Sequence, residues 1–463
     1  MAPLNVHIKS FGCQMNKLDT ALVASALKDK GFTLTDDPKD ADVVLINTCS
    51  VRKHAEDRVT SHLGHLKHLK ETRPEIIVAV IGCMAQRQGA ALLNHKAVDI
   101  VCGPAQIPQI PQLIEDALRT KTAKIAVTPH IREKSSQQQI DALENFESVY
   151  DTDDKQLPAQ AFVRVMRGCN NFCSYCIVPY VRGPEISRSP GVIIDQIRTL
   201  AGNGIKQITL LGQTVNSYHY SAGDKNYCLA DILEMASRIN GIEWIRFITS
   251  YPAERFFEPI CCAMARLPKV CRYLHLPAQS GSDRILKAMN RRYTASQYLN
   301  LLDKARSIVP GIAISSDFIV GFPSETEHDF RATAELVEKA RLKNSFIFKY
   351  SPRPGTAATD LPDDVPMEIK KKRNTQLLDI QNEISDTDNK RFIGSAVRVL
   401  VEGPGKKPHL NAAENADLPQ LIARTAEDYI VVFNGPADLA GSFCSVNIIK
   451  TSPLTLFGEL APR

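Results

Sequence analysis

Three cysteines in the stretch GCNNFCSYC, residues 168–176, constrain this chain most. Cys169, Cys173 and Cys176 form a C-x3-C-x2-C array, and no fourth cysteine stands beside them. A structural zinc site usually takes four ligands in two pairs, so zinc fits this spacing poorly. An iron-sulfur cluster held by three cysteines instead of four leaves one iron open to another ligand. The array therefore predicts a 4Fe-4S cluster with an open iron, rather than zinc or three unrelated core thiols.

A chain of 463 residues exceeds what one hydrophobic core usually organises, so several domains are expected. In residues 1–118, apolar runs alternate with helical patterns, which predicts an α/β domain with a doubly wound parallel sheet. Residues 119–158 lack strong periodicity and are expected to form a linker. Six strand-like runs, separated by room for crossover helices, predict a (β/α)6 partial TIM barrel at 159–390. Five short strand-like runs predict a small β-barrel at 391–463.

The C-x3-C-x2-C array follows the first predicted strand of the partial barrel, AFVRVM, after a single turn. In barrels of this kind the chemistry takes place at the carboxyl ends of the strands. The array is therefore expected on a loop at the catalytic mouth.

A second set of cysteines shows no compact motif. Cys13, Cys49 and Cys83 each follow an apolar run, in IKSFGC, LINTC and AVIGC. The carboxyl ends of parallel strands meet at one edge of the sheet, so these thiols are expected to converge there, each beside a helix start that favours thiolates. The alternative is three buried core cysteines. Cys102 also ends a strand, but it precedes its glycine where Cys13 and Cys83 follow theirs, so it is expected to point elsewhere.

The array, its position after the first barrel strand and the aromatic Tyr175 before the last cysteine resemble the radical S-adenosylmethionine (SAM) superfamily. The resemblance implies that SAM chelates the open iron through its amino and carboxylate groups. It also implies that the reduced cluster splits SAM into methionine and a 5′-deoxyadenosyl radical, which abstracts hydrogen from an unactivated C–H bond. The protein would supply position and exclusion of water.

Two three-cysteine sites followed by a small barrel resemble the methylthiotransferases, and the match covers nearly the whole chain. The stretches that carry it are FGCQMN, INTCSVRKHAEDR, IGCMAQR, RGCNNFCSYCIVPYVRG, LLGQTVNSY, HLPAQSGSDRILKAMNRRYT, SSDFIVGFPSETEHDF and YSPRPGTAA. The last domain is similar to the TRAM RNA-binding module. FGCQMN, NTCSVR and IVPYVRG are most similar to the branch that replaces the C2 hydrogen of N6-isopentenyl-adenosine at tRNA position 37, beside the anticodon, with a methylthio group.

The resemblance implies two 4Fe-4S clusters and two SAM molecules for each product. The cluster on Cys13, Cys49 and Cys83 would hold the sulfur to be donated and accept a methyl group. The cluster on Cys169, Cys173 and Cys176 would generate the radical. The implied partners are the tRNA anticodon loop, an electron donor and a sulfur donor, and the chain is expected to be a monomer.

Polar residues at other predicted strand ends are candidates for SAM binding. Gln213 follows the second barrel strand, Gln279 follows the fourth, and Asp317 lies in the fifth, all toward the predicted mouth. Each could instead satisfy loop backbone groups, and Asp317 is slightly favoured for function. His275 is interpreted as a satisfied histidine of the barrel interior rather than a base.

The composition of the chain indicates the cellular compartment and the kind of partner that the protein binds. No run of eighteen apolar residues exists, and MAPLNVHIKSFGC lacks the form of a signal peptide, so the cytoplasm is expected and no membrane partner. Twelve cysteines in that reducing compartment are better explained by metal binding, catalysis or core packing than by disulfides. The net charge of +5 is mild, but Lys406, Lys407 and Arg424 of the last barrel are expected to contact RNA phosphates. Removal of residues 391–463 should accordingly weaken tRNA binding and leave SAM cleavage largely intact.

Three alternatives stay open at the level of sequence. Related methylthiotransferases act on threonylcarbamoyl-adenosine in tRNA or on an aspartate of a ribosomal protein. Outside enzymology, the chain could be an RNA-binding protein with structural clusters, a reading that open irons make improbable.

Overall fold

The computed structural model describes residues 4–50, 53–129, 131–133, 136–148, 150, 158–405 and 418–462. The chain divides into two compact units. The first unit comprises Met1–Asp153, Met166–Phe172 and Cys176–Arg188, and the second comprises Asp154–Val165, Cys173–Tyr175 and Ser189–Arg463. The chain therefore passes between the units inside the loop that carries the C-x3-C-x2-C array.

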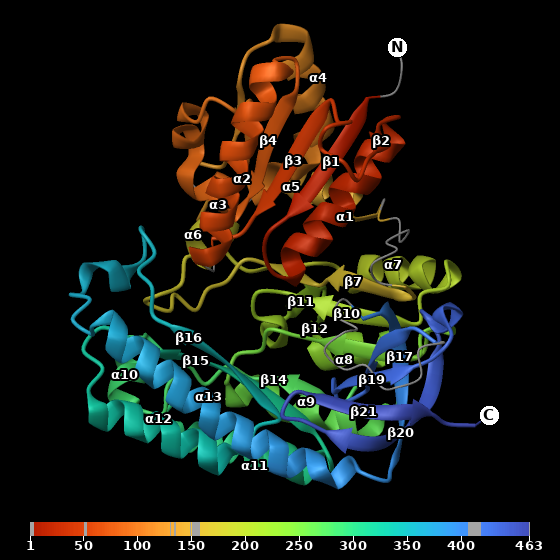
Figure 1. Ribbon diagram of the computed structural model, residues 1–463, viewed down its shortest axis with the longest axis vertical. Coiled ribbons are helices and arrows are strands. Elements are labelled where there is room, and N and C mark those ends of the chain that lie inside the picture. Colours follow the sequence, from red (N-terminus) through yellow and green to blue (C-terminus); the bar gives the residue numbers. More distant parts are fainter. Residues whose placement is uncertain are drawn as a thin grey trace. The chain divides into compact units, whose positions relative to one another are not determined.

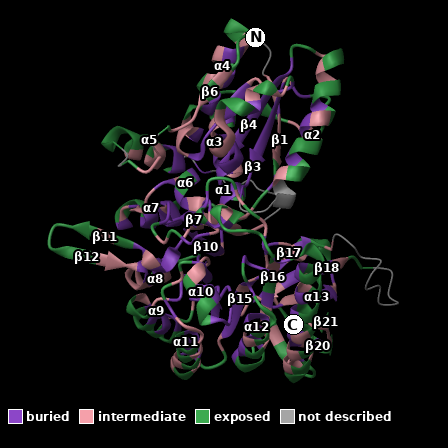
Figure 2. Cartoon of the chain, turned by 90° about the vertical axis from the view of Figure 1, so that its left-hand side faces the viewer, coloured by how far each residue is buried: buried purple, intermediate pink, exposed green. Residues whose placement is uncertain are grey.

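A six-stranded sheet in the order β2-β1-β3-β4-β5-β6 forms the core of the first unit, and every pairing in it is parallel. The central strands are buried along their whole length because VVLINT and IVAVIG are apolar on both faces. Helices cover both faces of the sheet (Figure 1), and Figure 2 shows its strands buried between them. The predicted doubly wound parallel sheet is confirmed. Its strands are β1 (Asn5–Ser10), β2 (Thr33–Leu34), β3 (Val43–Thr48), β4 (Ile77–Gly82), β5 (Ile100–Cys102) and β6 (Lys124–Ala126).

The first unit contains a helix and a strand that the sequence did not suggest. Helix α5 and strand β6 both lie in residues 119–158, which were expected to form a linker. The composition of this stretch is polar and its amphipathic pattern is weak. Strand β2 has only two residues and is exposed, so periodicity could not reveal it. The helices are α1 (Gln14–Asp29), α2 (Lys53–Thr72), α3 (Cys83–Gln88), α4 (Ile110–Thr120), α5 (Gln137–Ser148) and α6 (Val178–Arg182). The short strands β8 (Met166–Arg167) and β9 (Ile186–Ser187) pair beside them.

The second unit contains the six predicted barrel strands as two parallel three-stranded sheets, β13-β10-β7 and β14-β15-β16. A parallel bridge between Ile245 and Val270 joins the sheets, so the predicted partial barrel is confirmed. The strands are β7 (Gln160–Arg164), β10 (Gln207–Leu211), β13 (Trp244–Phe247), β14 (Tyr273–His275), β15 (Ala313–Val320) and β16 (Asn344–Lys349). The helices are α7 (Pro190–Gly202), α8 (Leu229–Ser237), α9 (Glu254–Arg266), α10 (Asp283–Ala288), α11 (Ala295–Ile308), α12 (Glu327–Ala340) and α13 (Met367–Asn389). A hairpin of β11 (His219–Ala222) and β12 (Lys225–Cys228) is an insertion that the sequence did not predict.

The C-terminal segment closes into a five-stranded barrel in the order β17-β18-β19-β21-β20, as predicted. Arg424 on β18 donates its guanidinium N–H groups to Glu402 and Asp428 within the protein, and its expected contact with RNA phosphates stays a prediction. Lys406 and Lys407 lie outside the described residues. The strands are β17 (Ala396–Pro404), β18 (Gln420–Thr425), β19 (Ile430–Asn434), β20 (Phe443–Thr451) and β21 (Thr455–Leu460).

The small barrel packs against the partial barrel, inside the second unit. Tyr273 and Ala313 of the partial barrel belong to the hydrophobic core of the small barrel. Arg246 on β13 donates to the backbone oxygens of Thr425 and Ala426, and Lys343 binds Asp428. The two barrels therefore share one core. Among the described residues, no helix combines the length and the apolar character needed to cross a membrane.

Candidate active site

The first candidate site lies where three neighbouring strands of the first unit end. Cys13 caps the start of α1, Cys49 follows β3 and Cys83 begins α3 directly after β4. A hydrogen bond between the Cys13 and Cys49 side chains lowers the pKa of Cys13 to about 6, although burial opposes this shift. Burial raises the pKa of Cys83, and Arg182 partly offsets that effect. The strand ends therefore bring the three thiols together, as the parallel order predicted.

Two glycines permit this close approach. A Cβ on Gly12 would lie 2.5 Å from Asn16 Oδ1 and 2.9 Å from the Cβ of Cys49. Gly82 has a φ of +95°, and a Cβ there would lie 2.5 Å from the backbone oxygen of Thr48. Real side chains do not tolerate such distances, so glycine is required immediately before Cys13 and Cys83.

A buried amide network holds the loop ends beneath the cysteines. Asn16 Nδ2 donates to Asn47 Oδ1 at 2.9 Å and to the Thr48 oxygen at 2.7 Å, while Asn47 Nδ2 donates back to the Asn16 oxygen at 2.8 Å. The Cys13 thiol donates to Asn16 Oδ1 at 3.3 Å. Thr48 Oγ1 continues the chain of hydrogen bonds to the oxygen of Ile81, two residues before Cys83. The network thus links all three strand ends.

A buried arginine completes this site. Arg182, in the IVPYVRG stretch at the end of α6, donates from Nε to the Cys83 sulfur at 3.3 Å and from a terminal nitrogen to Asp19 Oδ2 at 2.8 Å. The side chains of Arg182 and Asp19 are 8% and 3% exposed. Ile177 and Val181 of the same stretch pack against Cys83. Arg182 was not among the predicted site residues, although its place in the cysteine-bearing stretch RGCNNFCSYCIVPYVRG was a usable signal.

Cys102 does not join the other three thiols through any described contact. It is fully buried at the end of β5, its thiol lies 3.5 Å from the oxygen of Gly103, and burial raises its pKa far above the usual range. This agrees with the expectation that Cys102 points elsewhere.

The second candidate site is the loop between β8 and α6 that carries the C-x3-C-x2-C array. In the first unit, Cys169 donates its backbone N–H to the Gly183 oxygen at 3.1 Å, and its sulfur accepts from Asn171 Nδ2 at 3.4 Å. In the second unit, the sulfur of Cys173 accepts from a terminal nitrogen of Arg291 at 3.4 Å. N–H groups that donate to sulfur stabilise the thiolate form that a cluster requires.

Both sets of cysteines were tested for their fit to an iron-sulfur cluster by the chemistry of their donors. Thiolates are the ligands of such clusters, and each set also receives an N–H donor on sulfur from a buried or partly buried arginine. Within the part of the chain that the structure describes, no group of three His, Cys, Asp or Glu side chains is spaced to hold a single metal ion. The type of donor suits an iron-sulfur cluster, and the assignment of clusters to these two sets of cysteines stays a prediction.

The other predicted site residues have distinct environments at the strand ends of the second unit. Both side-chain amide atoms of Gln213 are buried, and no described group bonds them. Gln279 is buried with a φ of +72°, and its backbone bridges β15 next to Asp317. Asp317 binds Nε2 of His275 at 3.1 Å, so His275 is a satisfied interior histidine as interpreted. Tyr175 packs against the hydrophobic cluster of Met289, Phe322 and Tyr350.

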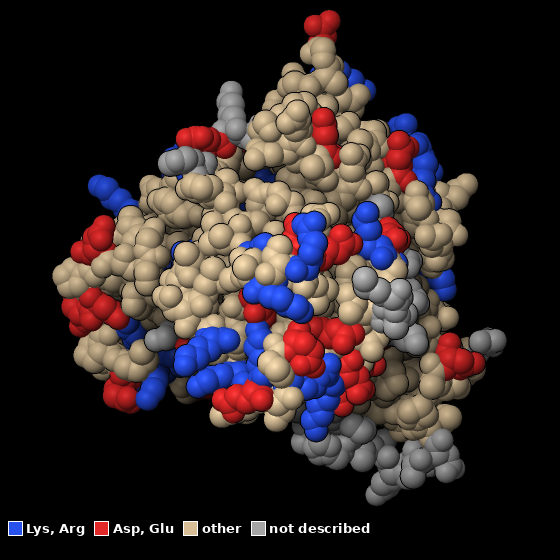
Figure 3. Space-filling view, turned by 90° about the horizontal axis from the view of Figure 1, so that it is seen from above, with Lys and Arg blue, Asp and Glu red and all other residues tan. Residues whose placement is uncertain are grey.

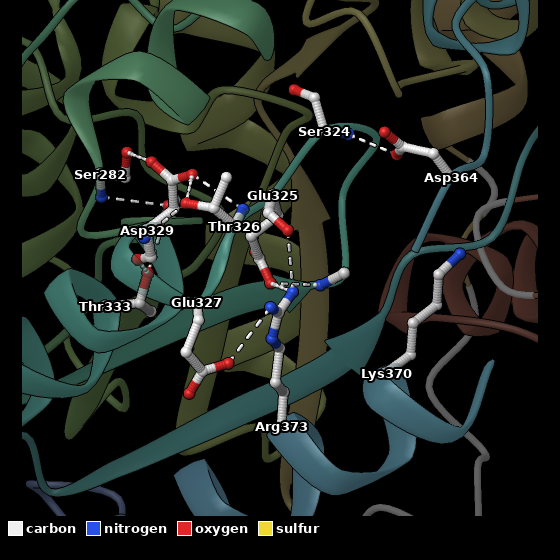
Figure 4. A network of polar contacts seen from close by, with 12 residues as sticks. Ser282, Ser324, Glu325, Thr326, Glu327, Asp329, Thr333, Asp364, Lys370 and Arg373 are labelled. Carbon is white, nitrogen blue, oxygen red and sulfur yellow. Dashed lines mark hydrogen bonds and ion pairs between the residues drawn. The ribbon is translucent and has the colours of Figure 1, made fainter. Parts of the chain in front are cut away.

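A polar network around Ser282, Glu325 and Asp329 fixes the loops after β14 and β15 (Figure 4). Thr333 on α12 accepts the backbone N–H of Gly281 at 2.9 Å, and Asp329 accepts the hydroxyl of Ser282 at 2.6 Å. Glu325 accepts the backbone N–H of Gly321 and pairs with Arg373 of α13, both at 2.8 Å. The loops after β14 and β15 are thereby held to α12 and α13.

Comparisons with known proteins agree with this arrangement. Residues 5–103 match the model of the Uncharacterized protein family UPF0004, and residues 163–337 match that of the Radical SAM superfamily. A tRNA-2-methylthio-N(6)-dimethylallyladenosine synthase of Rhodopirellula baltica is 43% identical over 98% of this chain and 95% of its own length. The enzyme of that name from Aeromonas hydrophila is 41% identical over 98% of this chain and 91% of its own length.

A solved structure resembles the fold at low sequence identity. The radical S-adenosylmethionine methyltransferase TsrM from Kitasatospora setae aligns with a TM-score of 0.54 and 15% identity, and 77% of each chain is covered. At this sequence identity the likeness concerns the fold alone. Identity over nearly the full length, together with both family models, shows that the chain belongs to the tRNA-2-methylthio-N(6)-dimethylallyladenosine synthase family of radical SAM methylthiotransferases.

Proposed function

We propose that this enzyme replaces the C2 hydrogen of N6-isopentenyl-adenosine at tRNA position 37 with a methylthio group, using two SAM molecules and a sulfur donor. The observation that carries the proposal is the second set of thiols. Radical chemistry at one cluster needs only the C-x3-C-x2-C array, whereas Cys13, Cys49 and Cys83 converge at a separate sheet edge. A second open cluster suits a reaction that must also deliver sulfur. The relatives named above favour adenosine in tRNA over a ribosomal protein as the substrate.

Family membership implies a 4Fe-4S cluster and SAM. We propose that Cys169, Cys173 and Cys176 hold this cluster, and that Cys13, Cys49 and Cys83 hold a second one. When bound, the cluster on Cys169, Cys173 and Cys176 would supply, with SAM, the radical that abstracts hydrogen, and the second cluster would supply the sulfur. The chain itself would hold SAM through Gln213, Gln279 and Asp317, with Tyr175 beside the last cysteine. The unpaired amide of Gln213 supports this role, since a buried polar group without a partner is costly unless a ligand satisfies it.

The partners follow from the same reaction. The proposed substrate is the tRNA anticodon loop, and the enzyme needs an electron donor and a sulfur donor. On the face drawn in Figure 3, basic and acidic side chains are interspersed, so charge alone does not mark an RNA path there. We further propose a monomer that works in the cytoplasm, with the last domain as the RNA-binding part. The cysteine content supports that compartment. The domain boundaries at residues 118, 158 and 390 stay predictions.

Nucleoside analysis of tRNA tests the function. A strain without this gene should lack the methylthio group on isopentenyl-adenosine and retain the unmethylthiolated nucleoside, and the intact gene should restore it. In vitro, an isopentenylated anticodon stem-loop should react, and the same RNA with unmodified or threonylcarbamoyl-adenosine should react poorly. An apolar pocket would favour the isopentenyl chain by about 25 cal/mol per Å² buried. Faster turnover of the threonylcarbamoyl substrate would assign the enzyme to the sister branch.

A further inference from the structure

Each candidate cluster site has its own arginine, and the two arginines differ in charge balance. At the first site, Arg182 contacts both the sulfur of Cys83 at 3.3 Å and the carboxylate of Asp19 at 2.8 Å. Its positive charge is therefore matched by a buried negative charge. Asp19 lies on α1, six residues after Cys13, so cation and anion both belong to the wall of the site.

At the second site, Arg291 contacts the sulfur of Cys173 at 3.4 Å and the oxygen of Pro277 at 2.8 Å. Its guanidinium also lies 4.4 Å from the ring centre of Tyr251. Among the described residues, no carboxylate forms an ion pair with Arg291. A partly buried cation is costly without an anionic partner, and the Cys173 sulfur that Arg291 contacts would be anionic as a cluster ligand.

Charge and N–H···S hydrogen bonds help set the reduction potential of an iron-sulfur cluster. A nearby cation stabilises the reduced cluster, because reduction adds negative charge, and a nearby carboxylate does the opposite. Contacts of this kind beyond the ligands tune metal sites without touching the substrate.

We propose that Arg182 with Asp19, and Arg291 alone, are positioning residues that set the reduction potentials of the two clusters separately. The inference rests on the proposed function, because it requires clusters on both sets of cysteines. The uncompensated Arg291 raises the potential of the radical cluster. The Arg182–Asp19 pair leaves the first cluster nearly unshifted, since its two charges act in opposite directions.

The first site is tested in the full chain with Cys169, Cys173 and Cys176 replaced by alanine, so that one cluster remains. Its potential is measured by redox titration followed by electron paramagnetic resonance. Arg182→Gln should lower the potential and Asp19→Asn should raise it. The double variant should return toward the parent value, and Arg182→Lys should lie nearer the parent than Arg182→Gln. If the Arg182→Gln protein does not fold, the potentials of Asp19→Asn and of the double variant still test whether the two charges act in opposite directions.

The second site is tested in the full chain with Cys13, Cys49 and Cys83 replaced by alanine. Arg291→Gln should lower the potential of the remaining cluster, and Arg291→Lys should lower it less. Arg292→Gln is the matched control, because Arg292 is the next residue in the chain and its side chain is exposed. This substitution should leave the reduction potential unchanged.

Unchanged potentials in Arg182→Gln, Asp19→Asn and Arg291→Gln would overturn the inference. If the parent chains hold iron as expected in that case, the proposed function still stands. Parent chains that bind no iron on one set of cysteines would instead refute the proposed cluster assignment, and with it the inference. Equal shifts from Arg291→Gln and Arg292→Gln would also overturn it, since a general charge effect would then suffice.

Discussion

The side chains of Asn16 and Asn47 bind each other at 2.9 Å beneath the three strand-end cysteines. Both residues are fully buried, and Asn47 also donates to the backbone of Asn16 and to Thr20. They join the start of α1 to the end of β3, so the positions of Cys13 and Cys49 depend on this pair. A polar pair of this kind is stabilising only when both partners are present.

Replacing Asn47 with alanine should therefore lower the free energy of unfolding by about 1–3 kcal/mol, because buried donors and acceptors lose their partners. Denaturant unfolding of the apoprotein measures this, and iron content after reconstitution should fall as well. The control is Asn300→Ala on the exposed face of α11, which should change stability by no more than about 0.5 kcal/mol. Equal effects of the two substitutions would contradict the structural role of the pair.

The array cysteines are predicted to hold half of the iron. Anaerobically reconstituted enzyme should contain about eight irons per chain. Replacing Cys169, Cys173 and Cys176 together with alanine should halve this content and abolish SAM cleavage, measured as 5′-deoxyadenosine. One zinc with little sulfide in the parent protein would refute the prediction.

The strand-end cysteines are predicted to act in sulfur delivery alone. Replacing Cys13, Cys49 and Cys83 with alanine should halve the iron, leave SAM cleavage in place and eliminate the methylthio product. Cys102→Ala is the matched control, because this buried thiol ends the neighbouring strand, and it should keep the full iron content. Full product formation by the triple variant would show that these cysteines only pack.

Removal of residues 391–463 is now expected to disrupt the partial barrel as well as tRNA binding. The small barrel shares its core with Tyr273 and Ala313 and accepts hydrogen bonds from Arg246, so deletion would expose apolar surface and strand a buried cation. The rate of SAM cleavage and the midpoint of thermal unfolding should both fall. The control Ile449→Ser, at an exposed position of β20, should change neither quantity. A truncated chain with normal SAM cleavage would restore the expectation from sequence of a separable RNA-binding module.

Stability should depend on pH through Lys343. Burial lowers its pKa from 10.5 to about 8, although Asp428 opposes this shift. Between these values the unfolded chain binds more protons than the folded one, so the free energy of unfolding contributed by Lys343 rises with pH across that window. Lys343→Met should remove a slope of at most about 1.4 kcal/mol per pH unit. Denaturant unfolding at several pH values checks this, with the exposed Lys339→Met as control. Identical slopes in Lys343→Met and the parent would contradict it.

The sequence determined the elements and the chemistry. Apolar runs such as VVLINT predicted the central strands, because a strand buried on both faces must be apolar throughout. The short spacing of Cys169, Cys173 and Cys176 is a local property that needs no tertiary information. The cysteines at three successive strand ends followed from the one rule that parallel strands end at the same edge.

Only the tertiary structure decided which charges meet. Arg182 and Cys83 are separated by 99 residues, and Arg424 on the small barrel pairs with Glu402 and Asp428. The periodicity of the sequence does not reveal which charged side chains pair, because a buried arginine and an exposed one cannot be told apart in the sequence. A buried charge is stable only where a distant partner compensates it, so its role depends on the complete fold rather than on neighbouring residues.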